Sequence, residues 1–148
     1  MPALYQQSGI RFLYPENWSL VDEEIETWPR SVTVQSEETS FFTLHVYPAG
    51  HDMGEIIDTV IATIREEYPE LEILEAKESI GDLWAQGVDV CFFFLDLLVE
   101  AKIRAVQTPT YTLVWHYQAE NREFEKMEPV FQAIAISLMQ TQVAVARK

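Results

Sequence analysis

Three histidines, His45, His51 and His116, are the only imidazoles in the chain that can act as a general base or bind a metal ion. His45 and His116 each lie in an alternating segment, so both are expected on β-strands. If those strands are neighbours, the two rings can meet on one face of a sheet. The alternative is that each histidine is an isolated strand residue, satisfied by hydrogen bonds or by water.

Runs of carboxylates raise the question of a calcium site. One run is Asp22-Glu23-Glu24 with Glu26 close by, and further acidic residues occur at 37–38 and 70–75. Calcium takes about six to eight oxygen ligands that converge on one point. None of the runs contains the turn glycine and alternating Asp or Asn residues of a calcium loop. We therefore expect solvated strand ends, with no metal ion and no other cofactor.

The single cysteine, Cys91, stands inside the apolar segment from Val90 to Leu95. It has no partner for an intramolecular disulfide, and its surroundings predict a buried, unreactive core residue. The chain contains no nucleophile elbow, Walker loop, dinucleotide fingerprint or zinc-ligand spacing, and it has only five glycines. The sequence thus indicates no catalytic residue.

The formal net charge is −14, from 24 acidic and 10 basic residues. This charge argues against binding to a nucleic-acid backbone and against adhesion to an anionic membrane. Either the acidity only keeps the protein dispersed, or it attracts a partner protein with a basic or amphipathic face. For that contact we expect Asp22, Glu23, Glu24 and Glu26, with Trp28 as an apolar anchor.

Two kinds of periodicity divide the chain into helices and strands. Apolar residues three or four apart predict a helix from Asp52 to Tyr68, with Asp52 as its N-cap and Pro69 beyond its end. The same spacing predicts a last helix from Asn121 to about Leu138, followed by a flexible tail over 139–148. Alternation predicts strands at 10–14, 18–23, 32–36 and 41–47 before the first helix, and at 71–79, 84–95, 98–108 and 111–118 after it. In the strand 98–108, Glu100, Lys102 and Arg104 share one face, which we expect in water.

These elements predict one α+β domain, in which helices pack on an antiparallel meander sheet. The longest continuous apolar run is far shorter than the ~18–20 residues that span a bilayer. The N-terminus lacks the basic and apolar regions of a secretory signal. We therefore expect a cytoplasmic protein.

The sharpest local signal lies between Phe12 and Trp18. Pro15 has no N–H to donate to a sheet, so it ends the first strand, and the following Glu-Asn pair suits a turn. We expect a hairpin here. Its two large aromatic residues, Phe12 and Trp18, should be buried against one of the helices.

The motif Phe12-x-Tyr14-Pro15-x-x-Trp18, the capped helix 52–68, the four-strand meander and the phenylalanines of the last helix occur in this order. In these features the chain resembles the PsbP-like sandwich superfamily, which includes the PsbP subunit of photosystem II, a Ran-binding nuclear-transport factor and bacterial DcrB-related proteins. The resemblance implies an α/β/α sandwich over 1–148, with a core at about 9–138, and a binding role instead of enzymatic activity. It supplies no binding residue that matches a numbered position here.

Two functions therefore stand side by side. The first is a cytosolic binding or adaptor module that acts by protein–protein contact. In a chaperone-like version, its sheet shelters an apolar helix of a partner. The second is a small-ligand-binding protein or enzyme with a pocket between sheet and helix near His116. Its support in the sequence is the aromatic strand from Tyr111 to Tyr117, which contains His116.

Overall fold

The computed structural model describes residues 2–7, 9–23, 30–80 and 83–146, with the backbone alone at 23 and 141–146. Strands and helices follow one another without a long irregular segment in these ranges. Their order is β1 (Pro2–Gln7), β2 (Ile10–Pro15), β3 (Ser19–Glu23), β4 (Arg30–Gln35), β5 (Phe41–Pro48), α1 (Met53–Glu67), β6 (Glu72–Ile80), β7 (Leu83–Phe94), β8 (Leu97–Gln107), β9 (Tyr111–Glu120) and α2 (Asn121–Ala146).

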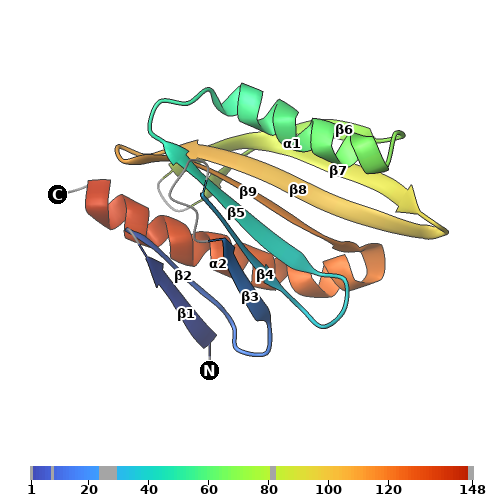
Figure 1. The fold of residues 1–148 in the computed structure, drawn as a ribbon, viewed down its shortest axis with the longest axis horizontal. Coiled ribbons are helices and arrows are strands. Elements are labelled where there is room, and N and C mark those ends of the chain that lie inside the picture. Colours follow the sequence, from blue (N-terminus) through green and yellow to red (C-terminus); the bar gives the residue numbers. More distant parts are fainter. Residues whose placement is uncertain (1, 8, 24–29, 81–82, 147–148) are drawn as a thin grey trace.

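A seven-stranded sheet with the order β3-β4-β5-β9-β8-β7-β6 forms the centre, and all its neighbouring strands are antiparallel. Helix α1 lies on one face, whereas α2 and the small sheet β1–β2 lie on the other (Figure 1). This arrangement confirms the predicted α+β class and the α/β/α sandwich.

Alternation along the strands produces two cores, one on each face of the sheet. On the α1 face, Ile57, Ile61 and Ile64 pack against strand residues such as Val90 and Ile103. Asp52 caps α1 as predicted, because its Oδ1 accepts a hydrogen bond from the N–H of Glu55 at 3.2 Å. The α2 face contains the aromatic core, which includes Phe12, Trp18, Phe42, Trp115, Tyr117, Phe124 and Phe131.

The predicted hairpin across Pro15 is wrong. Strand β2 pairs with β1, a strand that the sequence analysis missed, and β3 pairs with β4 in the large sheet. The N–H of Trp18 does donate to the carbonyl of Pro15 at 3.0 Å, so the turn exists, but it connects two sheets. The predicted burial is confirmed: Phe12 and Trp18 are both buried, and the Trp18 ring lies 6.0 Å from that of Phe131 in α2.

Helix α2 is longer than predicted. It continues to Ala146 and passes through Pro129 without starting a second helix, so the predicted helix end near Leu138 is corrected. The flexibility of the tail over 139–148 stays a prediction. Met139 is fully buried in the aromatic core, which explains why the helix extends past Leu138. None of the described helices has an apolar stretch long enough to cross a membrane.

Strands β7 and β8 approach each other unusually closely at Gly87. A Cβ atom there would lie 1.8 Å from the carbonyl oxygen of Ile103, so only glycine fits. The neighbouring Arg104 is 2% exposed, although alternation predicted that it shares a solvated face with Glu100 and Lys102. The prediction fails for Arg104 because α2 and the aromatic core cover that end of the strand.

Candidate functional site

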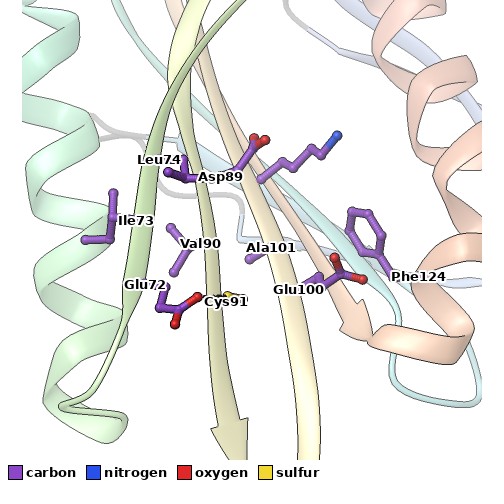
Figure 2. A pocket seen from close by; sticks show the side chains of 10 residues that line it. Glu72, Ile73, Leu74, Asp89, Val90, Cys91, Glu100, Ala101 and Phe124 are labelled. Atoms are coloured by element: carbon purple, nitrogen blue, oxygen red, sulfur yellow. Dashed lines mark hydrogen bonds between the residues drawn. The ribbon is translucent and has the colours of Figure 1, made fainter.

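An open groove of about 520 Å³ lies between β6–β8 and the beginning of α2 (Figure 2). In Figure 2, Ile73 points toward α1, away from the groove, whereas Glu100 and Phe124 face each other from the sheet and from α2. We call this the acidic groove. Its side chains are Glu72 and Leu74 of β6, Asp89 and Cys91 of β7, Glu100 and Lys102 of β8, and Phe124 of α2.

The acidic groove exists because α2 covers the middle of the sheet more than its β6 edge. Leu74, on the floor of the groove, is 71% exposed, and Phe93, two residues beyond Cys91 on the same face of β7, is 69% exposed. Side chains at spacing i, i+2 share a face of a strand, so these apolar groups continue the groove along the sheet. The groove therefore combines carboxylates with exposed apolar surface.

The two basic groups beside the groove are already paired. Lys102 Nζ lies 2.9 Å from Glu128 Oε2, and Arg104 Nη2 lies 2.7 Å from Asp89 Oδ1. Among the described residues, Glu72 and Glu100 have no ion-pair partner. Two carboxylates of the acidic groove therefore lie outside the ion pairs formed among the described residues.

Glu100 responds to these surroundings through its pKa. Partial burial raises the pKa of this carboxyl, and the negative charges of Glu128 and Glu125 raise it further, while Lys102 opposes them in part. A positive charge brought into the groove would reverse the like-charge repulsion. The electrostatics therefore favour a cationic ligand.

Cys91 is half-buried, so the prediction of a fully buried cysteine is corrected. Its thiol donates a hydrogen bond to Glu72 Oε2 over 3.3 Å. Burial, this hydrogen bond and the charges of Glu72 and Glu100 all raise the pKa of the thiol. The thiolate is the nucleophilic form, so Cys91 is poorly suited to covalent catalysis. In the part of the chain that the structure describes, no three His, Cys, Asp or Glu side chains converge to hold a metal ion.

The arrangement of the elements is similar to that of cyanobacterial PsbP (CyanoP) from Synechocystis sp. PCC 6803, with a TM-score of 0.68 at 11% sequence identity over 92% of this chain and 90% of that chain. The chain has the PsbP-like fold. A protein from Bacteroides thetaiotaomicron VPI-5482 is similar with a TM-score of 0.57 at 12% identity, over 88% of this chain and 46% of that chain. The protein PA94 of Pseudomonas aeruginosa, described as of unknown function, follows with a TM-score of 0.51 at 10% identity, over 93% and 95% of the two chains.

No family model matches the sequence, and no curated protein matches it either. The resemblance drawn from the Phe12–Trp18 motif and the order of the elements is thus confirmed at the level of the fold. At sequence identities of 10–12%, these similarities show the fold but not the function. The function therefore has to be argued from this chain's own surfaces.

The PsbP-like sheet does make His45 and His116 neighbours, on adjacent strands β5 and β9. Both histidines lie on the α1 side of the sheet, whereas the acidic groove lies on the α2 side. The acidic groove is therefore not the pocket near His116 that was expected for a small-ligand-binding protein or enzyme. Ser31 Oγ and His45 Nδ1 share a hydrogen bond of 2.8 Å, and the ring of His116 packs edge-on to Phe41 at 5.3 Å. Burial, and then the nearby His45, lower the pKa of His116 to about 4, so this imidazole is neutral at physiological pH.

The predicted partner-binding residues are described only in part. Asp22 accepts a hydrogen bond from the Tyr5 hydroxyl at 2.9 Å, which supports a local structural role. Burial and this carboxylate raise the pKa of Tyr5 to about 12. Glu24, Glu26 and Trp28 lie outside the described residues, as does the side chain of Glu23.

Sequence reasoning missed the acidic groove because its residues come from three strands and one helix. The alternation that placed Glu100 and Lys102 on one face was correct, as was the strand that contains Cys91. The missing signal was the position of α2, which no local pattern encodes. The i, i+2 spacing shows which charged residues of one strand share a face. It places Glu72 of β6 beside Asp89 of β7 only once the pairing of these two strands is known.

Proposed function

We propose that this protein is a cytoplasmic binding module that recognises another protein through a basic, amphipathic segment held in the acidic groove. The observation that carries the proposal is the pair of carboxylates, Glu72 and Glu100, that face the groove without an ion-pair partner among the described residues. Lysine or arginine side chains of a partner would supply the missing positive charge.

The neighbouring surface supports a protein ligand in preference to a small molecule. The volume of the groove falls within the range of small-ligand sites, but such sites bury most of the ligand surface. Here the groove is open, and exposed apolar side chains such as Leu74 and Phe93 extend it along the sheet. A segment with one cationic and one apolar face matches this combination. A lone cysteine without an intramolecular disulfide fits a reducing compartment.

The test uses a model helical peptide of lysine and leucine, titrated into the isotopically labelled protein. We expect chemical-shift changes in β6–β8 and in the first turns of α2. Raising the salt concentration from 0.05 M to 1 M should weaken binding strongly, because the screening length falls from more than 10 Å to about 3 Å. The variant Glu72→Gln/Glu100→Gln should weaken binding at low salt.

The matched control is Glu66→Gln/Glu67→Gln, which removes the same charge from the exposed end of α1. It should leave the affinity almost unchanged. Shift changes confined to another surface, or equal losses in both double variants, would contradict the acidic groove as the binding site. The N-terminal acidic residues are a separate prediction, tested in the same titration by Glu23→Lys/Glu24→Lys and by Trp28→Ala.

A further inference from the structure

The turn between β7 and β8 exposes a cluster of large apolar side chains. We call residues 93–97 the hairpin tip: Phe93 is 69% exposed, Phe94 48%, Leu95 81% and Leu97 39%, with Asp96 between the two leucines. Figure 1 shows this turn at one end of the molecule, beyond the C-terminal end of α1 and the N-terminal end of α2. Contiguous exposed apolar groups of this kind mark interaction sites.

The backbone at the hairpin tip is strained. Phe94 pairs with Leu97, so Leu95 and Asp96 form a two-residue turn, and Leu95 has a φ of 57°. Turns of this type favour Gly, Asn or Asp where φ is positive, because a bulky side chain is disfavoured there. The chain therefore presents a highly exposed leucine at a turn position that a smaller residue would occupy more easily. Strained residues of this kind concentrate at functional sites.

The hairpin tip is held in place from the α1 side. Tyr68, the C-cap of α1, stacks on Phe92 with ring centroids 4.3 Å apart and meets Phe94 edge-on at 5.8 Å. This contact fixes the end of the hairpin and leaves Phe93 and Leu95 free for other contacts. A rigid apolar projection loses little conformational entropy when it binds.

The charges around the hairpin tip select the kind of partner. Asp96 belongs to the turn, and Glu72 and Glu100 both pair with Cys91, two residues before Phe93. An anionic membrane would be repelled by these carboxylates and by the net charge of −14. A basic protein surface with an apolar face is complementary to them.

We propose that the hairpin tip is the apolar anchor for the same partner whose basic residues enter the acidic groove. This proposal rests on the proposed function, and it defines the partner as an amphipathic helix with a cationic and an apolar end region. Cys91 and Leu95 are separated by about 13 Å along the strand. That distance corresponds to about nine residues of an α-helix, so a helix of about 18 residues spans both surfaces.

The experiment compares two helical peptides of about 18 residues that carry the same lysines in one half, one with leucines and one with glutamines in the other half. The wild-type protein should bind the Lys/Leu peptide at least about tenfold more tightly, as the burial of one or two large apolar side chains predicts. The variant Phe93→Ser/Leu95→Gly should lose most of this preference and keep its affinity for the Lys/Gln peptide.

The control is Trp84→Ser, which removes another exposed aromatic ring from the opposite end of β7. It should keep the full preference for the Lys/Leu peptide. Glycine fits the φ of Leu95, and both replaced side chains are exposed, so the hairpin-tip variant should stay folded. An unchanged preference in that variant would overturn the anchor, even if binding remains salt-dependent. If Glu72→Gln/Glu100→Gln does not weaken the binding of the Lys/Gln peptide, the proposed function itself is wrong.

Two further measurements decide between this partner and other occupants. Sedimentation with phosphatidylglycerol or phosphatidylcholine vesicles should show no binding to either. Vesicle binding that depends on Phe93 and Leu95 would overturn the proposal in favour of a membrane contact. Sedimentation velocity of the protein alone should show no self-association through the hairpin tip. Self-association that the hairpin-tip variant abolishes would identify a second copy of the protein as the occupant and overturn the proposal.

Discussion

Arg104 places a full positive charge in a nearly inaccessible position of β8. Its guanidinium lies 2.7 Å from Asp89 Oδ1 and 3.3 Å from Glu78 Oε1, and it donates to the Val88 carbonyl at 3.1 Å. The two carboxylates are more than a third exposed, so water still reaches them. The buried member of this network is the cation, and the network keeps it hydrogen-bonded.

This asymmetry predicts which substitution is worse. Arg104→Met should lower the unfolding free energy by only about 1 kcal/mol. The cost is small because the substitution removes the buried charge and puts an apolar side chain in its place. Glu78→Gln/Asp89→Asn leaves the guanidinium buried without a counter-charge and should cost about 2–3 kcal/mol, after allowance for the exposure of its partners. Urea denaturation of both variants gives the comparison. The reverse order would mean that the ion pair itself dominates the stability.

His116 makes the stability depend on pH. Its folded-state pKa of about 4 lies below the ordinary value of 6.5, so the unfolded chain binds an extra proton between these two pH values. The unfolding free energy should be at its full value above about pH 6.5 and fall toward pH 4, by at most about 1.4 kcal/mol per pH unit for this residue. Burial also lowers the pKa of His45, so this residue should add to the loss of unfolding free energy as the pH falls.

The measurement is urea denaturation at several pH values between 4 and 7. His116→Gln should flatten the curve and leave a smaller slope from His45. The exposed His51 supplies the control variant His51→Gln, measured over the same pH range. If His116→Gln shows the full wild-type slope, the acid sensitivity arises from other groups.

At the level of the elements, the β7–β8 turn allows a stabilising substitution. Leu95→Gly removes the steric conflict at φ 57° and should raise the unfolding free energy by about 1 kcal/mol. Leu95→Ala keeps a Cβ atom at the same φ, so it should give no comparable gain. Thermal and chemical denaturation check both variants. Equal gains in both would show that exposure of the leucine, and not its backbone angle, is the destabilising factor.

Most strands and both helices could be predicted because alternation and i, i+3/i+4 spacing are local properties. The strand 98–108, for example, has Ala101 and Ile103 on one face and Glu100 and Lys102 on the other, as its pairing requires. The pairing of β2 could not be predicted from Pro15, because a proline ends a strand without determining where the next strand goes. β1 was missed because only Tyr5 is buried in it, so it shows no clear alternation.

The candidate site was predictable only in its chemistry. The acidity and the expectation of a basic or amphipathic partner came from composition, whereas the location depends on which strands are neighbours and on what α2 leaves uncovered. The apolar run from Val90 to Leu95 predicts a strand with Cys91 in the core. Its outer half is the exposed hairpin tip, because the strand extends beyond both helices.

For the whole molecule, the net charge of −14 should make folding and binding respond to salt in opposite directions. Sodium chloride screens the repulsion among the carboxylates, so the unfolding free energy should rise by on the order of 1 kcal/mol between 0.05 M and 0.5 M salt. The affinity for a lysine-rich peptide should fall over the same range. A parallel rise in both quantities would point to apolar contacts as the source of binding.

The insertion of β9 between β5 and β8 determines when each half of the sheet can be completed during synthesis. The strands from β6 to β9 pair with their neighbours in sequence, so they can form as the chain emerges. Strand β5 must wait for β9. Phe12 of β2 already contacts Phe42 in the apolar row of β5 (Phe42, Leu44 and Val46), but the core around this row is complete only when α2 follows. The N-terminal half therefore leaves the ribosome with an uncovered apolar surface, and a nascent chain truncated before α2 should require chaperones or aggregate.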